Sequence, residues 1–298
     1  MWIDCSGFRR VLIEPMGGGW VDYSKWLPVN KAMTYFHQYE ADEVIVPETL
    51  ALALPNGWMW QIPTQERYGC GYVYSDRFIS DEQAHKELEE VTGRTIDKFR
   101  IIPFNPGRCE KTWVGNVLAV GLSSHFLEPL EATSIHITCN SLDDFCSNYL
   151  HYSKQKTLID YNINLFNKTF TDMVDDYKSL IQMHYITRRE DSDFWKYVKY
   201  DLEITERNKE VLELCKNKVP AFKDFSGIVS ASGWGVWSWL LAGLGHISNE
   251  VVDDTIKNAN LNVDLEKLYS KMQMKYNDVP EIFYTHNEFI KDIKNKFI

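Results

Sequence analysis

The spacing of apolar residues changes along this chain, and that change limits the fold more than any other feature. The first part contains short apolar runs separated by turn residues, whereas apolar residues recur at helical spacing after about Ser134. The clearest helical patterns are Leu158 to Ile186 and Asp201 to Lys216. We therefore expect an α+β protein, with a strand-rich domain over 1–150 and a mostly helical region over 151–298. No Pro/Ser-rich linker separates them, so we expect them to pack as one body.

Local signals place several elements. Trp2 and Ile3 predict a short buried strand that ends in a Cys-Ser-Gly turn, where a sheet can present its backbone to a ligand. Ser80 is expected to cap a helix over 81–91, and another helix is expected to begin at Thr133 or Ser134. Further strands are expected at Val44–Val46, Met59–Ile62, Gly71–Tyr74, Phe99–Pro103 and within 111–121, and a charged helical tail at 251–298, interrupted at Pro280.

Charge and cysteine content exclude several classes of protein. The net charge is −10, from 32 basic and 42 acidic residues, which argues against a nucleic-acid partner. Six cysteines contain no CxxC pair and no zinc-ligand spacing, so we expect reduced thiols in a cytoplasmic protein without a metal site. The longest apolar stretch, Trp234 to Leu244, is too short to span a bilayer, and no secretion signal is visible.

Aromatic residues make up 14% of the chain and include ten tryptophans, several of them in tight groups. Such residues can simply pack a core, but they also line pockets for flat aromatic ligands. Trp58 and Trp60 alternate, so on a strand both side chains would lie on the same face.

Three blocks of sequence resemble the flavin-dependent tryptophan halogenases. Residues 57–63 read GWMWQIP, which matches that family's WxWxIP signature, and the following run RYGCGYVYS is similar to its RxGxGYVYS. Residues 113–135 resemble the WVGN…GL…FxEPLExTxI block, and residues 3–9 resemble its IDCSGFR strand end. The resemblance implies the remainder of a flavin-monooxygenase-like FAD fold with a substrate-binding β-sheet.

The family uses FADH2 from a separate flavin reductase, oxygen and chloride or bromide to make hypohalous acid, which halogenates an aromatic ring. By this resemblance Glu131 is the active-site glutamate, able to orient the electrophile and take the ring proton. We expect its side chain to be buried between aromatic residues, because burial would tune its acidity.

The resemblance also assigns binding residues. The halide is expected on the backbone amides of Thr133 and Ser134, which suits the positive end of a helix dipole. Flavin contacts are expected at Leu122 and Ile135, and at Gly7 in the turn after the first strand. Trp58, Trp60 and Pro63 are expected to line the route between flavin and substrate.

Two parts of the family pattern are absent from the sequence. The GxGxxG of the flavin pyrophosphate is not present, and Gly17-Gly18-Gly19 lacks its spacing. No lysine matches the family's catalytic lysine, since Lys25 and Lys31 follow the IDCSG segment. We therefore expect Met1 to begin inside a flavin domain, and the chain to be inactive without an N-terminal half or a homodimeric partner.

The substrate is less well defined by the sequence. The segment from Trp234 to Trp239 is aromatic and lacks the carboxylate that grips free tryptophan in the family. Indole-, tryptophan-like or phenolic substrates remain open. Two other functions are also open: a non-catalytic remnant or partner subunit that binds an aromatic ligand or another chain, and a flavin-dependent aromatic monooxygenase. We expect His125, His136 and His184 to be structural or exposed.

Overall fold

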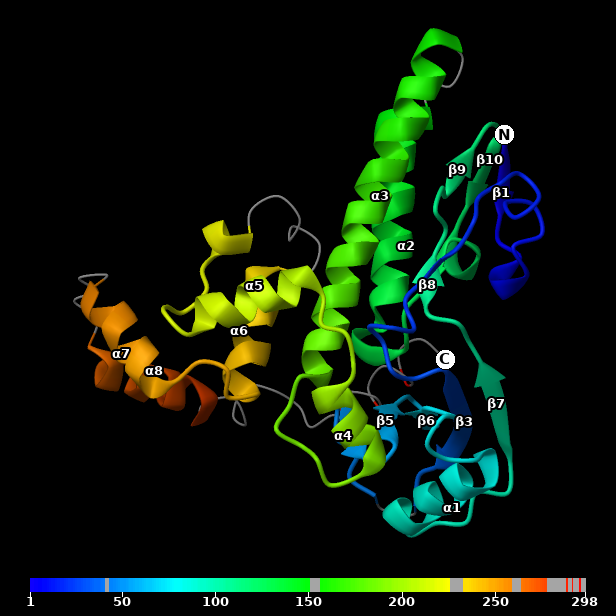
Figure 1. Cartoon of the computed structure of the whole chain (residues 1–298). Helices are drawn as coiled ribbons and strands as arrows, with labels where there is room; N and C mark the ends of the chain where they lie inside the picture. Colours follow the sequence, from blue (N-terminus) through cyan, green and yellow to red (C-terminus); the bar gives the residue numbers. More distant parts are fainter. Residues whose placement is uncertain are drawn as a thin grey trace.

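A long helix, α3 (Lys156–Tyr185), runs through the middle of the molecule, with the helices of residues 206–277 on one side and the small sheets near the N-terminus on the other (Figure 1). The computed structural model describes residues 1–40, 43–150, 156–225, 233–258 and 264–277, and the single positions 288, 291 and 295. Strands and helices are both well represented, which confirms the α+β class.

The largest sheet has five antiparallel strands in the order β4-β5-β6-β3-β7. The expected strands at Met59–Ile62, Gly71–Tyr74 and Phe99–Pro103 all lie in it, whereas the strand expected at Val44–Val46 is wrong. Val44 and Val46 are exposed and unpaired, because the edge strand forms further along the chain. The five strands are β3 (Lys31–Gln38), β4 (Leu50–Leu54), β5 (Gly57–Pro63), β6 (Arg67–Tyr74) and β7 (Phe99–Pro103).

Each face of this sheet has its own core, as the alternation of strand side chains requires. Met59 and Tyr72 pack on one face with Leu88 of α1 (Asp81–Thr92). The expected cap of α1 is confirmed, because the Ser80 side chain accepts a hydrogen bond from the Gln83 amide and the Gln83 side chain bonds back.

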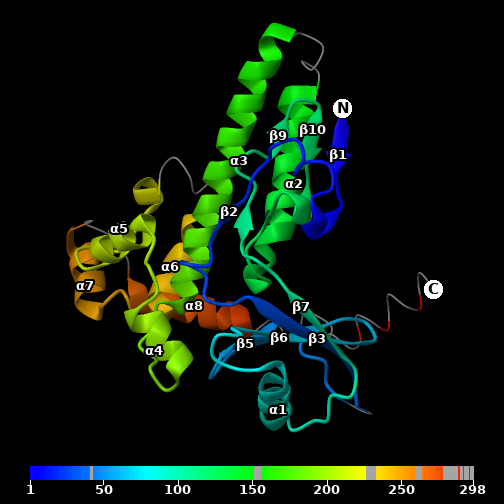
Figure 2. The same cartoon turned by 45° about the vertical axis from the view of Figure 1, so that its right-hand side comes forward.

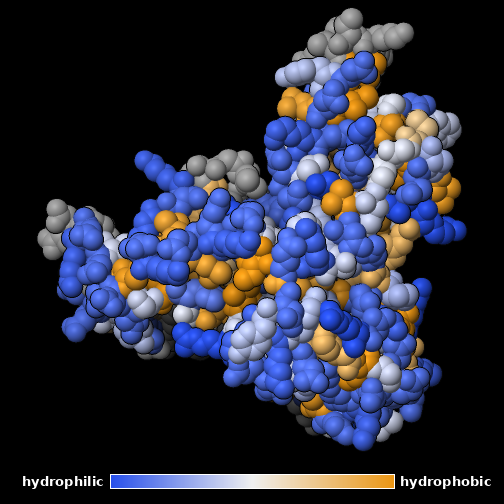
Figure 3. Space-filling model, viewed as in Figure 1, coloured by the Kyte–Doolittle hydropathy of each residue, from blue (hydrophilic) through white to orange (hydrophobic). Residues whose placement is uncertain are grey.

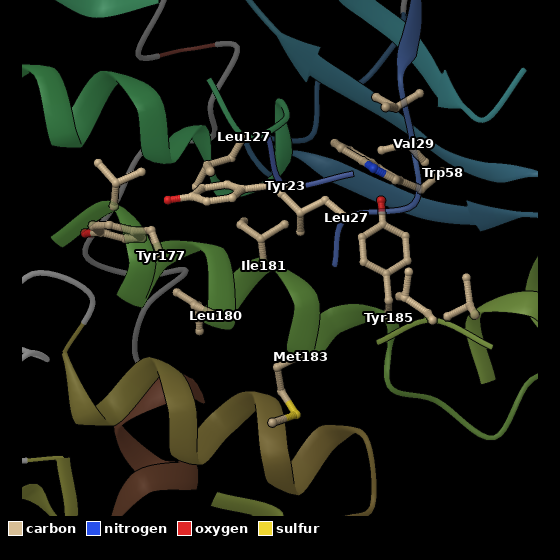
Figure 4. Close-up of a cluster of buried hydrophobic side chains, with 14 of the residues drawn as sticks. Tyr23, Leu27, Val29, Trp58, Leu127, Tyr177, Leu180, Ile181, Met183 and Tyr185 are labelled. Atoms are coloured by element: carbon tan, nitrogen blue, oxygen red, sulfur yellow. The ribbon is translucent and has the colours of Figure 1, made fainter. Parts of the chain in front are cut away.

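The opposite face of the sheet packs against α3. Trp58 and Val73 belong to the same buried cluster as Leu180 and Ile181 of the long helix. Figure 4 shows that Tyr185, at the end of α3, points its hydroxyl towards the Trp58 indole. The main core therefore includes residues from both sides of position 150, while the division into two domains there stays a prediction.

Two small sheets lie beside the upper part of α3. One has the order β1-β10-β9 and the other β11-β8-β2. β1 is paired with β10 on one side only among the described residues, so Trp2 is 66% exposed and the expected burial of Trp2 and Ile3 is wrong. The strands are β1 (Trp2–Asp4), β2 (Val21–Asp22), β8 (Gly107–Arg108), β9 (Trp113–Val114), β10 (Val117–Ala119) and β11 (His125–Phe126).

The helix expected near Thr133 is α2 (Thr133–Asp144), which lies alongside α3 in both views (Figures 1 and 2). The helix expected from Asp201 begins at Glu206 instead, because Thr205 caps it. Pro280 lies outside the described residues. Apolar side chains reach the surface around α5 and α6 (Figure 3). The remaining helices are α4 (Asp193–Tyr200), α5 (Glu206–Cys215), α6 (Trp234–Gly243), α7 (Asn249–Asn258) and α8 (Leu265–Asn277).

Candidate active site

The segment between β11 and α2 makes an unusual turn at Glu131. Its short 3-10 turn, Leu130–Ala132, contains Glu131 at φ 59° and is followed directly by the start of α2. Ala132 has φ 49°, so two consecutive residues with side chains adopt the left-handed conformation. That conformation costs roughly 1–2 kcal/mol per residue and persists only where the surrounding structure holds it.

Glu131 lies between two surface cavities and lines both of them. The first cavity, of about 420 Å³, is formed by this turn and by residues of β4 and β5. The second, of about 610 Å³, is formed with the end of α3 and with α6. A group at Glu131 can therefore meet reagents arriving from two directions.

The first cavity has an aromatic wall. Trp58 and Trp60 both line it, with ring centroids 5.8 Å apart, as their alternation on a strand predicts. The Trp60 ring lies over Gly71, where an added Cβ would come within 2.1 Å of the indole. Gly71 is therefore needed for Trp60 to occupy this position. Pro63 ends β5 and is not among the residues that line the cavity, whereas Ile62 is.

The second cavity is mostly apolar and is lined by α6 opposite Glu131. Trp239 is 81% exposed and presents its indole there, together with Val236 and Leu240. His184, from the last turn of α3, also lines this cavity. An exposed tryptophan beside a carboxylate and an imidazole can hold a flat ring next to polar groups.

The side chain of Glu131 is 49% exposed, so the expected burial between aromatic residues is wrong. Its Oε1 lies 3.3 Å from Nε2 of His184. The hydrogen bond from His184 is the main cause that lowers the pKa of Glu131 below its usual value. The carboxylate is thus ionised at neutral pH by a partner that the sequence analysis had expected to be structural or exposed.

Glu128, three residues earlier, is buried and was not expected to take part in the site. The hydroxyl of Tyr185 lies 2.8 Å from Oε2 and 3.1 Å from Oε1 of this carboxyl group. Burial raises the pKa of Glu128 to about 8, against smaller opposing effects of Tyr185 and Trp58. At neutral pH the group is therefore mainly a neutral acid. It links the turn to α3 and to the tryptophan wall.

Thr133 and Ser134 form the first turn of α2, as expected. The N-cap position is Ala132, which has no side chain to accept from the first amides. The hydroxyl oxygens of Thr133 and Ser134 are buried and have no hydrogen-bond partner among the described residues. A helix start with free amides and two unpaired hydroxyl groups fits a small anion.

The three residues expected to contact flavin lie on neighbouring elements. Gly7 begins the 3-10 turn Gly7–Arg9, and its carbonyl accepts a hydrogen bond of 3.2 Å from the Ser123 hydroxyl. Ser123 belongs with Leu122 to the turn Gly121–Ser123, which approaches α2 where an added Cβ on Gly121 would lie 4.0 Å from Thr138 Oγ1. Ile135, one turn before Thr138, is 69% exposed. Leu122 and Ile135 thus remain accessible near the start of α2.

The other expectations have mixed outcomes. His125 is buried, with a pKa lowered to about 4 by burial, and His136 is exposed, so both are confirmed as structural or exposed. Glu128, His184 and Tyr185 are the site residues that sequence reasoning missed. The only signal for His184 and Tyr185 was a pair of polar side chains at the end of the long apolar pattern, whereas Glu128 is the first glutamate of the EPLExT block.

The described residues offer neither a metal site nor a helix suited to crossing a membrane. They contain no cluster of three or more His, Cys, Asp or Glu side chains that could hold a metal ion. Nor do they contain a helix with the length and apolar character needed to cross a membrane.

Comparison with known proteins gives a consistent result. The tryptophan halogenase family matches residues 1–257. The tryptophan 7-halogenase KtzQ of Kutzneria sp. (strain 744) is 33% identical over 225 residues, which are 74% of this chain and 41% of that protein. The chain thus spans about two fifths of the length of the curated relatives it matches.

Solved structures agree. The flavin-dependent halogenase BrvH from Brevundimonas sp. BAL3 superimposes with a TM-score of 0.81 at 26% identity, covering 98% of this chain and 58% of that one. Xcc4156, a flavin-dependent halogenase from Xanthomonas campestris, gives a TM-score of 0.83 at 27% identity, covering 98% and 57%. The chain belongs to the family of flavin-dependent tryptophan halogenases.

Proposed function

We propose that this chain supplies the substrate-side half of a halogenase site, in which Glu131 acts on an aromatic ring attacked by hypohalous acid. The observation that carries the proposal is the position of Glu131, which lines both cavities and lies two residues before the uncapped start of α2. A carboxylate at that place can orient an incoming electrophile and accept the proton that the ring loses.

The halide is proposed to bind at Thr133 and Ser134, because the first amides of α2 and the two unpaired hydroxyl groups can donate to it. Reduced FAD, delivered by a separate flavin reductase, would supply two electrons to oxygen, so that one oxygen atom becomes water and the other oxidises the halide to hypohalous acid. Gly7, Leu122 and Ile135 are proposed to contact the flavin, since the latter two are exposed apolar side chains close to that helix start.

Trp58 and Trp60 are proposed to wall the route from the halide to the substrate, with Pro63 closing the end of their strand. The substrate is proposed to be an indole- or tryptophan-like ring in the second cavity. Its support is the exposed indole of Trp239 opposite Glu131 and the apolar lining of α6.

The relatives contain a large portion that this chain does not span, so the test supplies it. The chain is assayed with a flavin reductase, NADH, oxygen and bromide on indole and tryptophan. One arm uses the chain alone and the other adds the unmatched portion of KtzQ as a separate polypeptide. Brominated product in either arm supports the proposal. Hydroxylated product alone favours an aromatic monooxygenase, and bound substrate without any product favours a non-catalytic role; both outcomes reject it.

The halide site has its own test in Ser134→Glu. The new carboxylate should occupy the positive end of α2, where acidic residues stabilise a helix by about 0.3–1 kcal/mol, so folding is preserved. It should also repel the halide and raise the bromide concentration needed for half-maximal turnover by about tenfold or more. Glu250, already in the first turn of α7, offers a control position where Glu250→Ser should not change that concentration.

A further inference from the structure

His184 connects the end of α3 to the candidate catalytic carboxylate. Its Nδ1 lies 3.0 Å from the carbonyl oxygen of Leu180, one turn earlier in the same helix, and its Nε2 lies 3.3 Å from Glu131 Oε1. The imidazole is therefore held at both nitrogens, and its side chain is 21% exposed at the edge of the second cavity.

The chemistry of the two contacts determines which atom donates in each hydrogen bond. A carbonyl oxygen only accepts, so Nδ1 must carry a proton to bond Leu180. An ionised carboxylate also only accepts, so Nε2 must carry a proton to bond Glu131. Because the pKa of Glu131 is lowered, its carboxyl group does not supply that proton at neutral pH. The hydrogen bond between the two side chains is therefore donated by Nε2 of His184.

We propose that His184 is a positioning residue, which donates from Nε2 to Oε1 of Glu131 and keeps Oε2 free for the substrate. Oε2 has no hydrogen-bond partner among the described residues. This inference rests on the proposed halogenation at Glu131 and names the residue that aims its carboxylate. The same contact helps to hold the left-handed turn at Glu131 and Ala132, because it ties the turn to the rigid end of α3.

The arrangement suits the bond changes of aromatic halogenation. The ring forms a carbon–halogen bond as the oxygen–halogen bond of hypohalous acid breaks, and the departing hydroxide takes a proton from solvent to become water. The ring then transfers its C–H proton to Glu131 Oε2, and the C–H electron pair restores aromaticity. Glu131 returns that proton to solvent through its exposed side. A ring cation of this kind is far more acidic than a carboxylic acid, so position and charge of the acceptor matter more than its basicity.

Two substitutions of His184 distinguish a role in positioning Glu131 from a role in packing alone. In His184→Gln the side-chain amide can still donate to Glu131, whereas His184→Phe fills the space without a donor. With the complemented protein we expect His184→Phe to lower kcat by about 10- to 100-fold with little change in KM, and His184→Gln to recover most of the loss. His136→Gln, at an exposed histidine of α2, is the matched control. Full kcat in a folded His184→Phe protein would overturn the proposal.

A second measurement detects the contact between His184 and Glu131 without turnover. In protein labelled with 15N-histidine, the His184 signals are assigned by their loss in His184→Gln. Nε2 should carry a proton in the wild type and should lose it in Glu131→Gln, whose neutral amide can itself donate to Nε2. A wild-type Nε2 without a proton would reject the inference. If the complemented wild type makes no halogenated product while Nε2 is protonated, the proposed function fails and the pairing stands.

Discussion

Two glutamates three residues apart in the segment before α2 experience opposite environments. Glu128 is buried against Tyr185 and Trp58, and burial raises its pKa to about 8. Glu131 lies between two cavities, and its pKa is lowered by His184. One is mainly neutral at pH 7 and the other is ionised. The same side chain is therefore a buried acid at one position and a charged group lining two cavities at the other.

The difference arises from backbone geometry. Pro129 and the left-handed conformation of Glu131 turn the chain in this segment, and the Glu128 side chain is buried whereas that of Glu131 is half exposed. Adjacent residues Tyr185 and His184 at the end of α3 provide the partner for each. The end of one helix thus organises both glutamates.

Glu131→Gln should produce the largest effect on activity. The amide keeps the shape but cannot accept the ring proton as a base, so we expect halogenation by the complemented protein to fall by about 10²–10⁴-fold. The denaturation midpoint should change little, because the side chain is half exposed. Product formation is measured by mass spectrometry. If Glu131→Gln forms as much product as the wild type, Glu131 takes no part in the chemistry. The proposed functional difference from Glu128 would then be rejected.

The pH dependence of the free energy of unfolding should reveal the raised pKa of Glu128. Its folded pKa of about 8 exceeds its usual 4.5, so between these values the folded state binds more protons than the unfolded state. The stabilisation is fully present below pH 4.5 and is lost as the pH rises through 8. Between these values the free energy of unfolding should fall by at most about 1.4 kcal/mol per pH unit. Urea unfolding from pH 5 to 9 should show this slope reduced in Glu128→Gln. Equal slopes in both proteins would contradict the assignment.

Tyr185→Phe should destabilise the protein without a change of charge. It removes the hydroxyl partner of the buried Glu128 carboxyl group, which should lower the free energy of unfolding by about 1–3 kcal/mol. Tyr161→Phe, at an exposed position of the same helix, is the matched control and should stay within about 0.5 kcal/mol. If the two variants unfold at the same urea concentration, Tyr185 does not support Glu128.

Ala132→Gly should have the smallest effect on stability, and it should stabilise the fold rather than destabilise it. Glycine adopts a φ of 49° without the steric penalty of a Cβ, although it gains entropy in the unfolded chain. We expect the net stabilisation to be about 1 kcal/mol or less, measured by thermal unfolding. Ala84→Gly in the middle of α1 is the contrasting control, because the same change should destabilise a buried helical position. Destabilisation at residue 132 would show that the turn is not strained.

Local signals in the sequence predicted much of the fold. Ser80 caps α1 as expected, and Trp58 and Trp60 share a face because strand side chains alternate. The strand β3 was not predicted, although its residues pair on both sides, because its identity depends on neighbours that come later in the chain. Burial failed at Trp2 for the same reason: it depends on which elements cover a strand.

The sequence by itself determined the family, through the WxWxIP and EPLExT blocks, and the identity of Glu131 as the residue of interest. Only the tertiary structure decided what surrounds that residue. His184 is 53 positions away from Glu131 in the chain, and nothing local to either residue encodes their contact. Side-chain charge depends on solvent exposure and on partners brought together by packing. For that reason two identical glutamates in one short motif could be told apart only after the chain was folded.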